Sequence, residues 1–258
     1  MINHNINPVL LELGPLEIRY YGLVYFLGFL FTYYFLKSQI KQKTLNITEQ
    51  QLENFIIYAL IGMLIGSRLF TFLIYNPALF LNDPLIIFKI WQGGMAFHGS
   101  LTGLIIAGII FAKKNNIKFY DLADLVVIPA ALFLFLGRIA NYINAELPGI
   151  KTTVSWCVNF PGHEDCRHPY QIYEGLKNLG LFIAMMYLHL KKKLKPGIMF
   201  WGFILAYNSL RFIIDFLRDE ARIIISIGQT LSLIYVALSI YFLYHLSKKY
   251  KGKLFLKA

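Results

Sequence analysis

Residues 137–149 read Gly-Arg-Ile-Ala-Asn-Tyr-Ile-Asn-Ala-Glu-Leu-Pro-Gly, and they directly follow an uncharged apolar run over residues 125–136. In a helix, Arg138 and Asn141 would share one face, because they are three residues apart. A guanidinium near hydrocarbon is costly, so such residues usually face a polar interior or a substrate path. Alternatively, Arg138 anchors a helix end by extending its guanidinium to the membrane surface. We favour a functional role, because further polar groups crowd the same end of the run.

The composition of the whole chain places this run in a membrane protein. The 258 residues are 57% hydrophobic and only 15% charged, whereas soluble domains are usually about 25% charged. Long apolar runs are typical of membrane-spanning helices. We therefore predict an all-α polytopic membrane protein that forms one transmembrane domain over residues 1–258.

The net charge of +11 would suit a nucleic-acid partner, but the placement of the charge argues against one. Fifteen of the 25 Lys and Arg residues lie in four short segments that alternate with apolar runs. These segments are 37–43, 113–118, 191–195 and 248–257. Cytoplasmic loops of membrane proteins carry such an excess of positive charge. We expect these loops to lie against anionic lipid headgroups and expect no nucleic-acid partner.

The apolar runs predict seven transmembrane helices, with the N-terminus periplasmic and the C-terminus cytoplasmic. The helices are expected near residues 19–36, 54–75, 95–112, 122–142, 172–190, 197–216 and 227–246. Residues 76–95 are interrupted by prolines and glycines and predict an external arm, with a short amphipathic helix near 84–91. Residues 145–171 predict the longest external loop.

With this topology, ionisable and amide side chains gather at the outer ends of the spans. They are Tyr21, Arg68, His98, Arg138, Asn141, Glu174, Arg211 and Asp215. The inner halves of the spans carry few such groups, and scattered structural residues would not be expected to segregate in this way. We infer one polar cavity open to the outer face. Arg138 and Arg211 favour an anion there, because each guanidinium offers forked donors to a phosphate.

Carboxylates are candidates for holding these arginines in place. Asp215 follows Arg211 by four residues, which suits an i,i+4 pair on a helix. The alternative is that the two side chains only neutralise each other. Arg68 is expected to pair in the same way with a carboxylate such as Glu174.

His98 lies in the segment Gly-Gly-Met-Ala-Phe-His-Gly-Ser at 93–100. A neutral imidazole there suits either proton acceptance from a thiol or hydroxyl, or a hydrogen bond that fixes the arm. No Cys/His set has metal-ligand spacing, and no glycine-rich phosphate loop follows a strand, so we expect neither metal nor cofactor. Cys157 and Cys166 share one loop and are either bridged or two free thiols.

The 137–149 stretch resembles the signature of the prolipoprotein diacylglyceryl transferase family, Gly-Arg-x-Gly/Ala-Asn-Phe-x-Asn-x-Glu-x-x-Gly. Tyr142 stands where that pattern has Phe. Further segments resemble the family's motifs in the family's order, so the resemblance covers nearly the whole chain. These segments are 21–25, 93–99, 167–174, 211–212 and 228–229.

The resemblance implies a bacterial inner-membrane enzyme with seven spans. Family members move the diacylglyceryl group of phosphatidylglycerol onto the lipobox cysteine thiol of a preprolipoprotein, in its signal peptide region, and release glycerol 1-phosphate. By resemblance, Arg138 and Arg211 bind the phosphate, and the site also holds Tyr21, His98, Asn141, Glu146 and Gly149. Arg68, Glu174 and Asp215 are expected to support these residues.

Other functions remain as alternatives to the transferase. An anion transporter would use Arg138 and Arg211 as its binding site, but transporters often show internal repeats and this chain shows none. A membrane scaffold leaves the outer cluster of polar residues unexplained. A divergent paralogue that does not act on lipoproteins is the third alternative.

Overall fold

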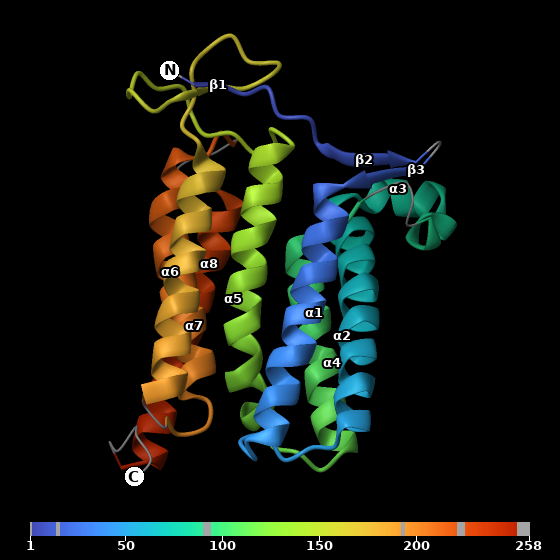
Figure 1. The fold of residues 1–258 in the computed structure, drawn as a ribbon, viewed down its shortest axis with the longest axis vertical. Coiled ribbons are helices and arrows are strands. Elements are labelled where there is room, and N and C mark those ends of the chain that lie inside the picture. The colour runs from blue at the N-terminus through green and yellow to red at the C-terminus, as the bar shows by residue number, and fades with distance from the viewer. Residues whose placement is uncertain (1, 14–15, 90–93, 192–193, 221–224, 252–258) are drawn as a thin grey trace. The chain divides into compact units, whose positions relative to one another are not determined.

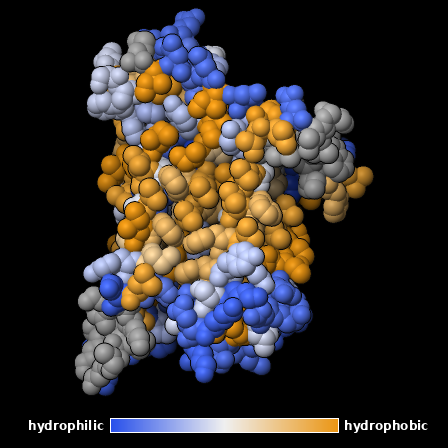
Figure 2. Space-filling view, viewed as in Figure 1, coloured by the Kyte–Doolittle hydropathy of each residue, from blue (hydrophilic) through white to orange (hydrophobic). Residues whose placement is uncertain are grey.

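The computed structural model describes residues 2–13, 16–89, 94–191, 194–220 and 225–251, which are mostly helical (Figure 1). Apolar side chains cover the middle of the helices on the face drawn in Figure 2, and hydrophilic side chains gather near the helix ends. Each of the seven expected spans coincides with a helix. They are α1 (Tyr20–Lys41), α2 (Glu49–Phe70), α4 (Phe97–Lys114), α5 (Phe119–Ile143), α6 (Tyr170–Lys191), α7 (Ile198–Ile214) and α8 (Ile227–Lys249).

Within the described residues, five helical segments are long and apolar enough to cross a membrane. They are Tyr20–Lys41, Glu49–Tyr75, Phe119–Ile143, Ile198–Leu217 and Ile227–Lys249. The helices α4 and α6 are not among these five. The first half of α6 is polar, because it carries Gln171, Glu174, Lys177 and Asn178. The structure therefore establishes a helical membrane protein with at least these five candidate spans.

The chain is mostly helical, but its N-terminal segment contains short strands that the all-α prediction did not include. The strand β1 (Ile2–Asn3) pairs in parallel with β4 (Val158–Asn159) of the 145–171 loop. The strand β2 (Val9–Leu13) pairs antiparallel with β3 (Leu16–Arg19), immediately before α1. Strands this short contain too few alternations to be read from a sequence.

The 76–95 arm also differs from its prediction. It holds a short helix α3 (Pro77–Asn82) and a 3₁₀ helix η2 (Pro84–Phe88), and it follows a π-helical turn η1 (Thr71–Tyr75) at the end of α2. A proline opens both α3 and η2, where its missing N–H has no helical partner to lose. The predicted helix at 84–91 is thus shorter, and residues 90–93 lie outside the described part of the chain.

Contacts between residues divide the chain into two compact units. Unit 1 comprises residues 1–32 and 124–258, and unit 2 comprises residues 33–123. In unit 1, α6 packs beside α7, and α7 packs beside α8 (Figure 1). The N-terminus of α7 is capped from another helix, because the Asp124 carboxylate of α5 accepts the backbone N–H groups of Gly197, at 2.6 Å, and Phe200, at 2.7 Å.

Unit 2 is built around a close antiparallel pair, α2 and α4. Four glycines face one another across the pair, Gly62 and Gly66 on α2 with Gly99 and Gly103 on α4. A Cβ atom added to Gly103 would overlap the carbonyl oxygen of Gly62, so no larger residue fits without moving a helix. Small residues at such spacing allow helix backbones to approach closely in membranes. Gly62 and Gly66 thus form a close packing contact with α4.

Candidate functional site

The polar side chains of unit 1 come from the ends of several helices. Arg138 and Asn141 lie in the last two turns of α5, and Glu146 lies in the turn that follows. Tyr170, Glu174 and Lys177 lie in the first turns of α6, and Tyr207 and Arg211 lie in the second half of α7. Asp215 begins the 3₁₀ helix η4 (Asp215–Leu217), and Tyr21 lies in the first turn of α1.

Tyr21, Asn141 and Glu146 form the more exposed part of the site. The Tyr21 hydroxyl donates to Glu146 Oε2 at 2.6 Å, and Asn141 Nδ2 donates to the Tyr21 hydroxyl and, at 3.0 Å, to the same Glu146 oxygen. The other Glu146 oxygen accepts from Asn144 Nδ2 at 3.2 Å. The tyrosine at the start of α1 is thus tied to the end of α5.

Arg138 connects this part to a buried carboxylate. Its Nη1 donates to Asn141 Oδ1 at 3.2 Å, as expected for two residues on one face of a helix, and its Nη2 lies 3.4 Å from Glu174 Oε2. The other Glu174 oxygen accepts from Lys177 Nζ at the shorter distance of 2.7 Å. Glu174 is fully buried and the Lys177 side chain is 2% exposed, so Glu174 is shared by two cations and bound more closely by the lysine.

Lys177 also links Glu174 to the second arginine. Its Nζ lies 4.0 Å from the centroid of the Tyr207 ring, which is within cation–π range. The Tyr207 hydroxyl accepts from Arg211 Nη1 at 3.1 Å, and Arg211 Nε donates to Asp215 Oδ2 at 3.3 Å. The predicted i,i+4 pair of Arg211 and Asp215 is therefore confirmed. Tyr170 donates to the other oxygen of Asp215.

These contacts form one continuous network from Tyr21 to Asp215 within unit 1. Its inner part contains three cations, Arg138, Lys177 and Arg211, and two carboxylates, Glu174 and Asp215. Among the residues that the structure describes, this part of the network thus holds one more cation than carboxylate. A surplus positive charge on forked donors suits a singly charged phosphodiester.

Gly149 lies in a tight backbone crossing beside the network. Its N–H donates to the carbonyl oxygen of His168 at 2.9 Å, and an added Cβ would lie 2.7 Å from both the His168 and Leu217 carbonyl oxygens. Only glycine fits there without moving the backbone. The contacts described for Gly149 thus give it a structural reason to be glycine, independent of any lipid.

Arg68 was expected to pair with a carboxylate such as Glu174, and the hydrogen bonds that the structure describes for it are made to backbone carbonyls instead. The Arg68 side chain is buried in unit 2 and donates to the backbone carbonyls of Ile86, Ile87 and Lys89 in the arm. These carbonyls lie in the last turn of η2 and directly after it, and carbonyl oxygens at a helix end are available to a guanidinium. The sequence alone does not reveal this choice, because acceptors on a backbone carry no residue signature.

His98 lies in the first turn of α4 in unit 2. Its side chain is outside the described part of the structure, and its role therefore stays a prediction.

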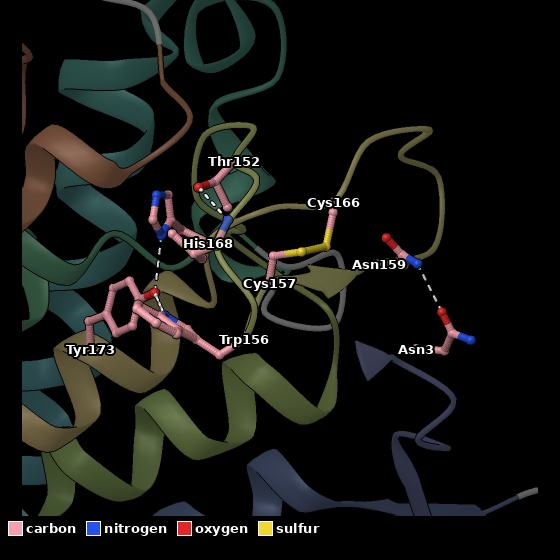
Figure 3. Close-up of a disulfide and its surroundings, with 9 residues drawn as sticks. Asn3, Thr152, Trp156, Cys157, Asn159, Cys166, His168 and Tyr173 are labelled. Carbon is pink, nitrogen blue, oxygen red and sulfur yellow. Dashed lines mark hydrogen bonds between the residues drawn. A yellow bond between two sulfur atoms is a disulfide. The ribbon is translucent and has the colours of Figure 1, made fainter. Parts of the chain in front are cut away.

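The 145–171 loop is held by covalent and polar contacts near the start of α6. Cys157 and Cys166 form a disulfide, which decides the alternative that the sequence left open (Figure 3). The Tyr173 hydroxyl lies 2.7 Å from Trp156 Nε1, which donates to it, and 3.0 Å from His168 Nδ1 (Figure 3). Burial lowers the pKa of the His168 imidazole below its usual range.

Sequence reasoning missed Lys177, Tyr170 and Tyr207, which complete the network. The signal for two of them was helical spacing, since Lys177 follows Glu174 by three residues and Tyr207 precedes Arg211 by four. Tyr170 reaches Asp215 across 45 residues of sequence and carries no comparable local signal.

Fold and site together define a helical membrane protein with a polar network whose buried inner part carries more cations than carboxylates. The model of the family described as prolipoprotein diacylglyceryl transferase matches residues 8–245. A phosphatidylglycerol–prolipoprotein diacylglyceryl transferase of Geobacter sulfurreducens is 39% identical over 236 residues, which cover 88% of this chain and 90% of that protein. Proteins of the same name from Vibrio atlanticus and Rickettsia bellii are each 38% identical, over 89% and 92% of this chain and 86% and 94% of their own lengths. The chain belongs to the prolipoprotein diacylglyceryl transferase family.

Proposed function

We propose that this protein transfers the diacylglyceryl group of phosphatidylglycerol to the lipobox cysteine thiol of a preprolipoprotein, the first step of lipoprotein maturation. The observation that carries the proposal is the continuous network that joins Arg138 to Arg211 and, among the described residues, holds one more cation than carboxylate. Membership of the family and the high coverage of its relatives support the same reaction.

The chemistry explains why two arginines are needed. A thiolate attacks a glyceryl carbon of the lipid, a carbon–sulfur bond forms, and the carbon–oxygen bond to the phosphate breaks. The electron pair leaves with the phosphate, so a singly charged diester becomes a more negative monoester, glycerol 1-phosphate. Arg138 and Arg211 are fixed donors that stabilise this growing charge in a site of low dielectric constant. His98, as a neutral imidazole, is the proposed acceptor of the thiol proton.

The remaining site residues have positioning roles in this proposal. Asn141 positions the Arg138 guanidinium, and Tyr21 and Glu146 in turn hold Asn141. Gly149 fixes the backbone that follows Glu146. Glu174 and Asp215 orient the two arginines, and Arg68 supports the arm next to His98.

We also propose that the seven long helices described above cross the bacterial inner membrane within one transmembrane domain. The N-terminus and the 145–171 loop would be periplasmic and the basic C-terminus cytoplasmic. The Cys157–Cys166 disulfide supports a periplasmic loop, because disulfides persist in oxidising compartments. Phosphatidylglycerol and the signal peptides of preprolipoproteins would then reach the site from the bilayer, among other membrane lipids.

The test uses purified protein in detergent, phosphatidylglycerol and a synthetic lipobox peptide. Release of glycerol phosphate, coupled to a gain of one diacylglyceryl mass on the peptide, is expected from the wild type and lost in Arg138→Ala. A folded wild-type protein that releases no glycerol phosphate with a peptide accepted by another family member would overturn the proposal.

A further inference from the structure

Asn178 is a buried amide on α6 that the reaction described above does not use. It is 0% exposed, and among the residues that the structure describes neither its Oδ1 nor its Nδ2 has a hydrogen-bond partner. Because both atoms lack a partner, either orientation of the amide leaves a donor and an acceptor free. Buried polar groups nearly always have partners, so this amide indicates a polar ligand group that the protein itself does not supply.

Asn178 lies next to the phosphate-binding part of the network. It follows Glu174 by four residues, which places the two side chains on one face of α6 with about 6 Å between their Cβ atoms. Glu174 in turn contacts Arg138 Nη2. A headgroup of three carbons, attached to a phosphate held by Arg138, is long enough to reach the Asn178 amide.

Lys177 places a positive charge beside Asn178. Its ammonium group neutralises Glu174 at 2.7 Å and is itself buried against the Tyr207 ring. A second ammonium group, as in phosphatidylethanolamine, would meet this cation where screening by water is weak. An uncharged glycerol headgroup meets no such repulsion, and its hydroxyls both donate and accept hydrogen bonds, as an amide requires.

We propose that Asn178 binds the glycerol hydroxyls of phosphatidylglycerol and that Lys177 beside it disfavours lipids with a cationic headgroup. The pair makes the lipid site selective for a hydroxylated, uncharged headgroup. This inference rests on the proposed function for the identity of the lipid, but it concerns binding and is tested without turnover.

The first experiment measures displacement of radiolabelled phosphatidylglycerol from the purified, detergent-solubilised chain with no peptide present. The competitors are phosphatidylglycerol and phosphatidylpropanol, which has the same phosphodiester and carbon chain but no headgroup hydroxyls. The wild type is expected to prefer phosphatidylglycerol about tenfold, a difference of about 1.4 kcal/mol. In Asn178→Leu this preference is expected to disappear, with phosphatidylpropanol bound as well as before.

A second buried asparagine provides a matched control. Asn208 lies in α7, and its Nδ2 already donates to the carbonyl oxygen of Ile204 at 2.8 Å. Asn208→Leu is therefore expected to keep the preference for phosphatidylglycerol. Asn178→Ser, which retains one hydroxyl, is expected to give an intermediate ratio and serves if the leucine variant does not fold.

The second experiment tests the charge at Lys177 with phosphatidylethanolamine as competitor. Lys177→Met is expected to improve competition by this lipid about tenfold relative to phosphatidylglycerol, whereas Lys177→Arg keeps the charge and the rejection. Unchanged ratios in folded Asn178→Leu, Asn178→Ser and Lys177→Met would overturn the inference and would mean that water alone occupies the site. Selective binding without any transfer to peptide would instead overturn the proposed function and leave this inference standing.

Discussion

Unit 1 and unit 2 each hold an arginine near the end of an apolar helix, and they satisfy it in different ways. Arg68 of unit 2 is almost fully buried and donates to several backbone carbonyls of the arm. Arg138 of unit 1 contacts two side chains, Asn141 and Glu174, and Glu174 is bound more closely by Lys177. A guanidinium has five N–H donors. Arg138 can therefore donate to a ligand as well, whereas Arg68 donates to backbone carbonyls that hold the arm.

The two units also differ in the residues through which their helices contact one another. In unit 2, four glycines bring the α2 and α4 backbones into close contact. In unit 1, the helices α5, α6 and α7 are joined by a polar network that includes buried ion pairs. Buried ion pairs contribute little net stability compared with apolar packing, so their placement here points to binding rather than to folding.

The largest expected effect comes from exchanging each arginine for lysine. Arg138→Lys keeps the charge but loses the forked donors, and we expect transfer to fall about 100-fold with little change in thermal stability. Arg68→Lys is expected to lower the melting temperature instead, because carbonyls of the arm lose their donors. Transfer assays and thermal melting of both purified variants measure this. Equal loss of activity at unchanged stability in both variants would contradict the distinction.

The next largest effect is expected from loss of the disulfide, which should destabilise unit 1 and leave unit 2 unaffected. Cys157→Ser with Cys166→Ser removes a short covalent loop, and we expect unit 1 to lose about 2–3 kcal/mol of stability. Hydrogen exchange should increase in the 145–171 loop and the start of α6 while α2 and α4 keep their protection. Reduction of the wild-type protein is the control and should reproduce the pattern; increased exchange centred on α2 and α4 would show that the units are not independent.

For the close glycine contact between α2 and α4, we expect a somewhat smaller effect on the stability of unit 2. Gly103→Val places side-chain atoms against the Gly62 carbonyl and is expected to cost about 1–3 kcal/mol of unfolding free energy. Gly180→Val in α6 is the matched control, because an added Cβ there meets nothing within 4 Å. Denaturant titration in detergent of both variants gives the difference, and equal losses would show that helix propensity rather than the close contact sets the cost.

The smallest effect is a pH dependence confined to the loop of unit 1. The pKa of His168 is lowered in the folded state by burial, so the unfolded chain binds a proton first as the pH falls. The contribution of His168 to stability is therefore complete above about pH 6.5 and is lost as the pH falls through the lower, folded-state pKa. His168→Asn should flatten the stability profile in this window by less than about 2 °C in melting temperature. A steeper profile in the variant would contradict the assignment.

The parts of this structure that follow from local patterns were predictable from the sequence. Apolar runs located the long helices of the described residues, and i,i+4 spacing identified the pair of Arg211 and Asp215. Arg138 and Glu174 lie 36 residues apart, and their contact depends on how α5 and α6 pack, which no local pattern encodes. The backbone acceptors of Arg68 could not be predicted from the sequence, because every residue offers a carbonyl.

The cap on α7 has a consequence for how the chain assembles in the membrane. Gly197 has no side chain to cap α7, and the two backbone N–H groups at its start are bound by Asp124, about 70 residues earlier in the chain. Because synthesis proceeds from the N-terminus, the cap is already present when α7 emerges from the ribosome. The first turn of α7 is completed only when it docks beside an earlier span, so order of insertion and correct docking are coupled through one carboxylate.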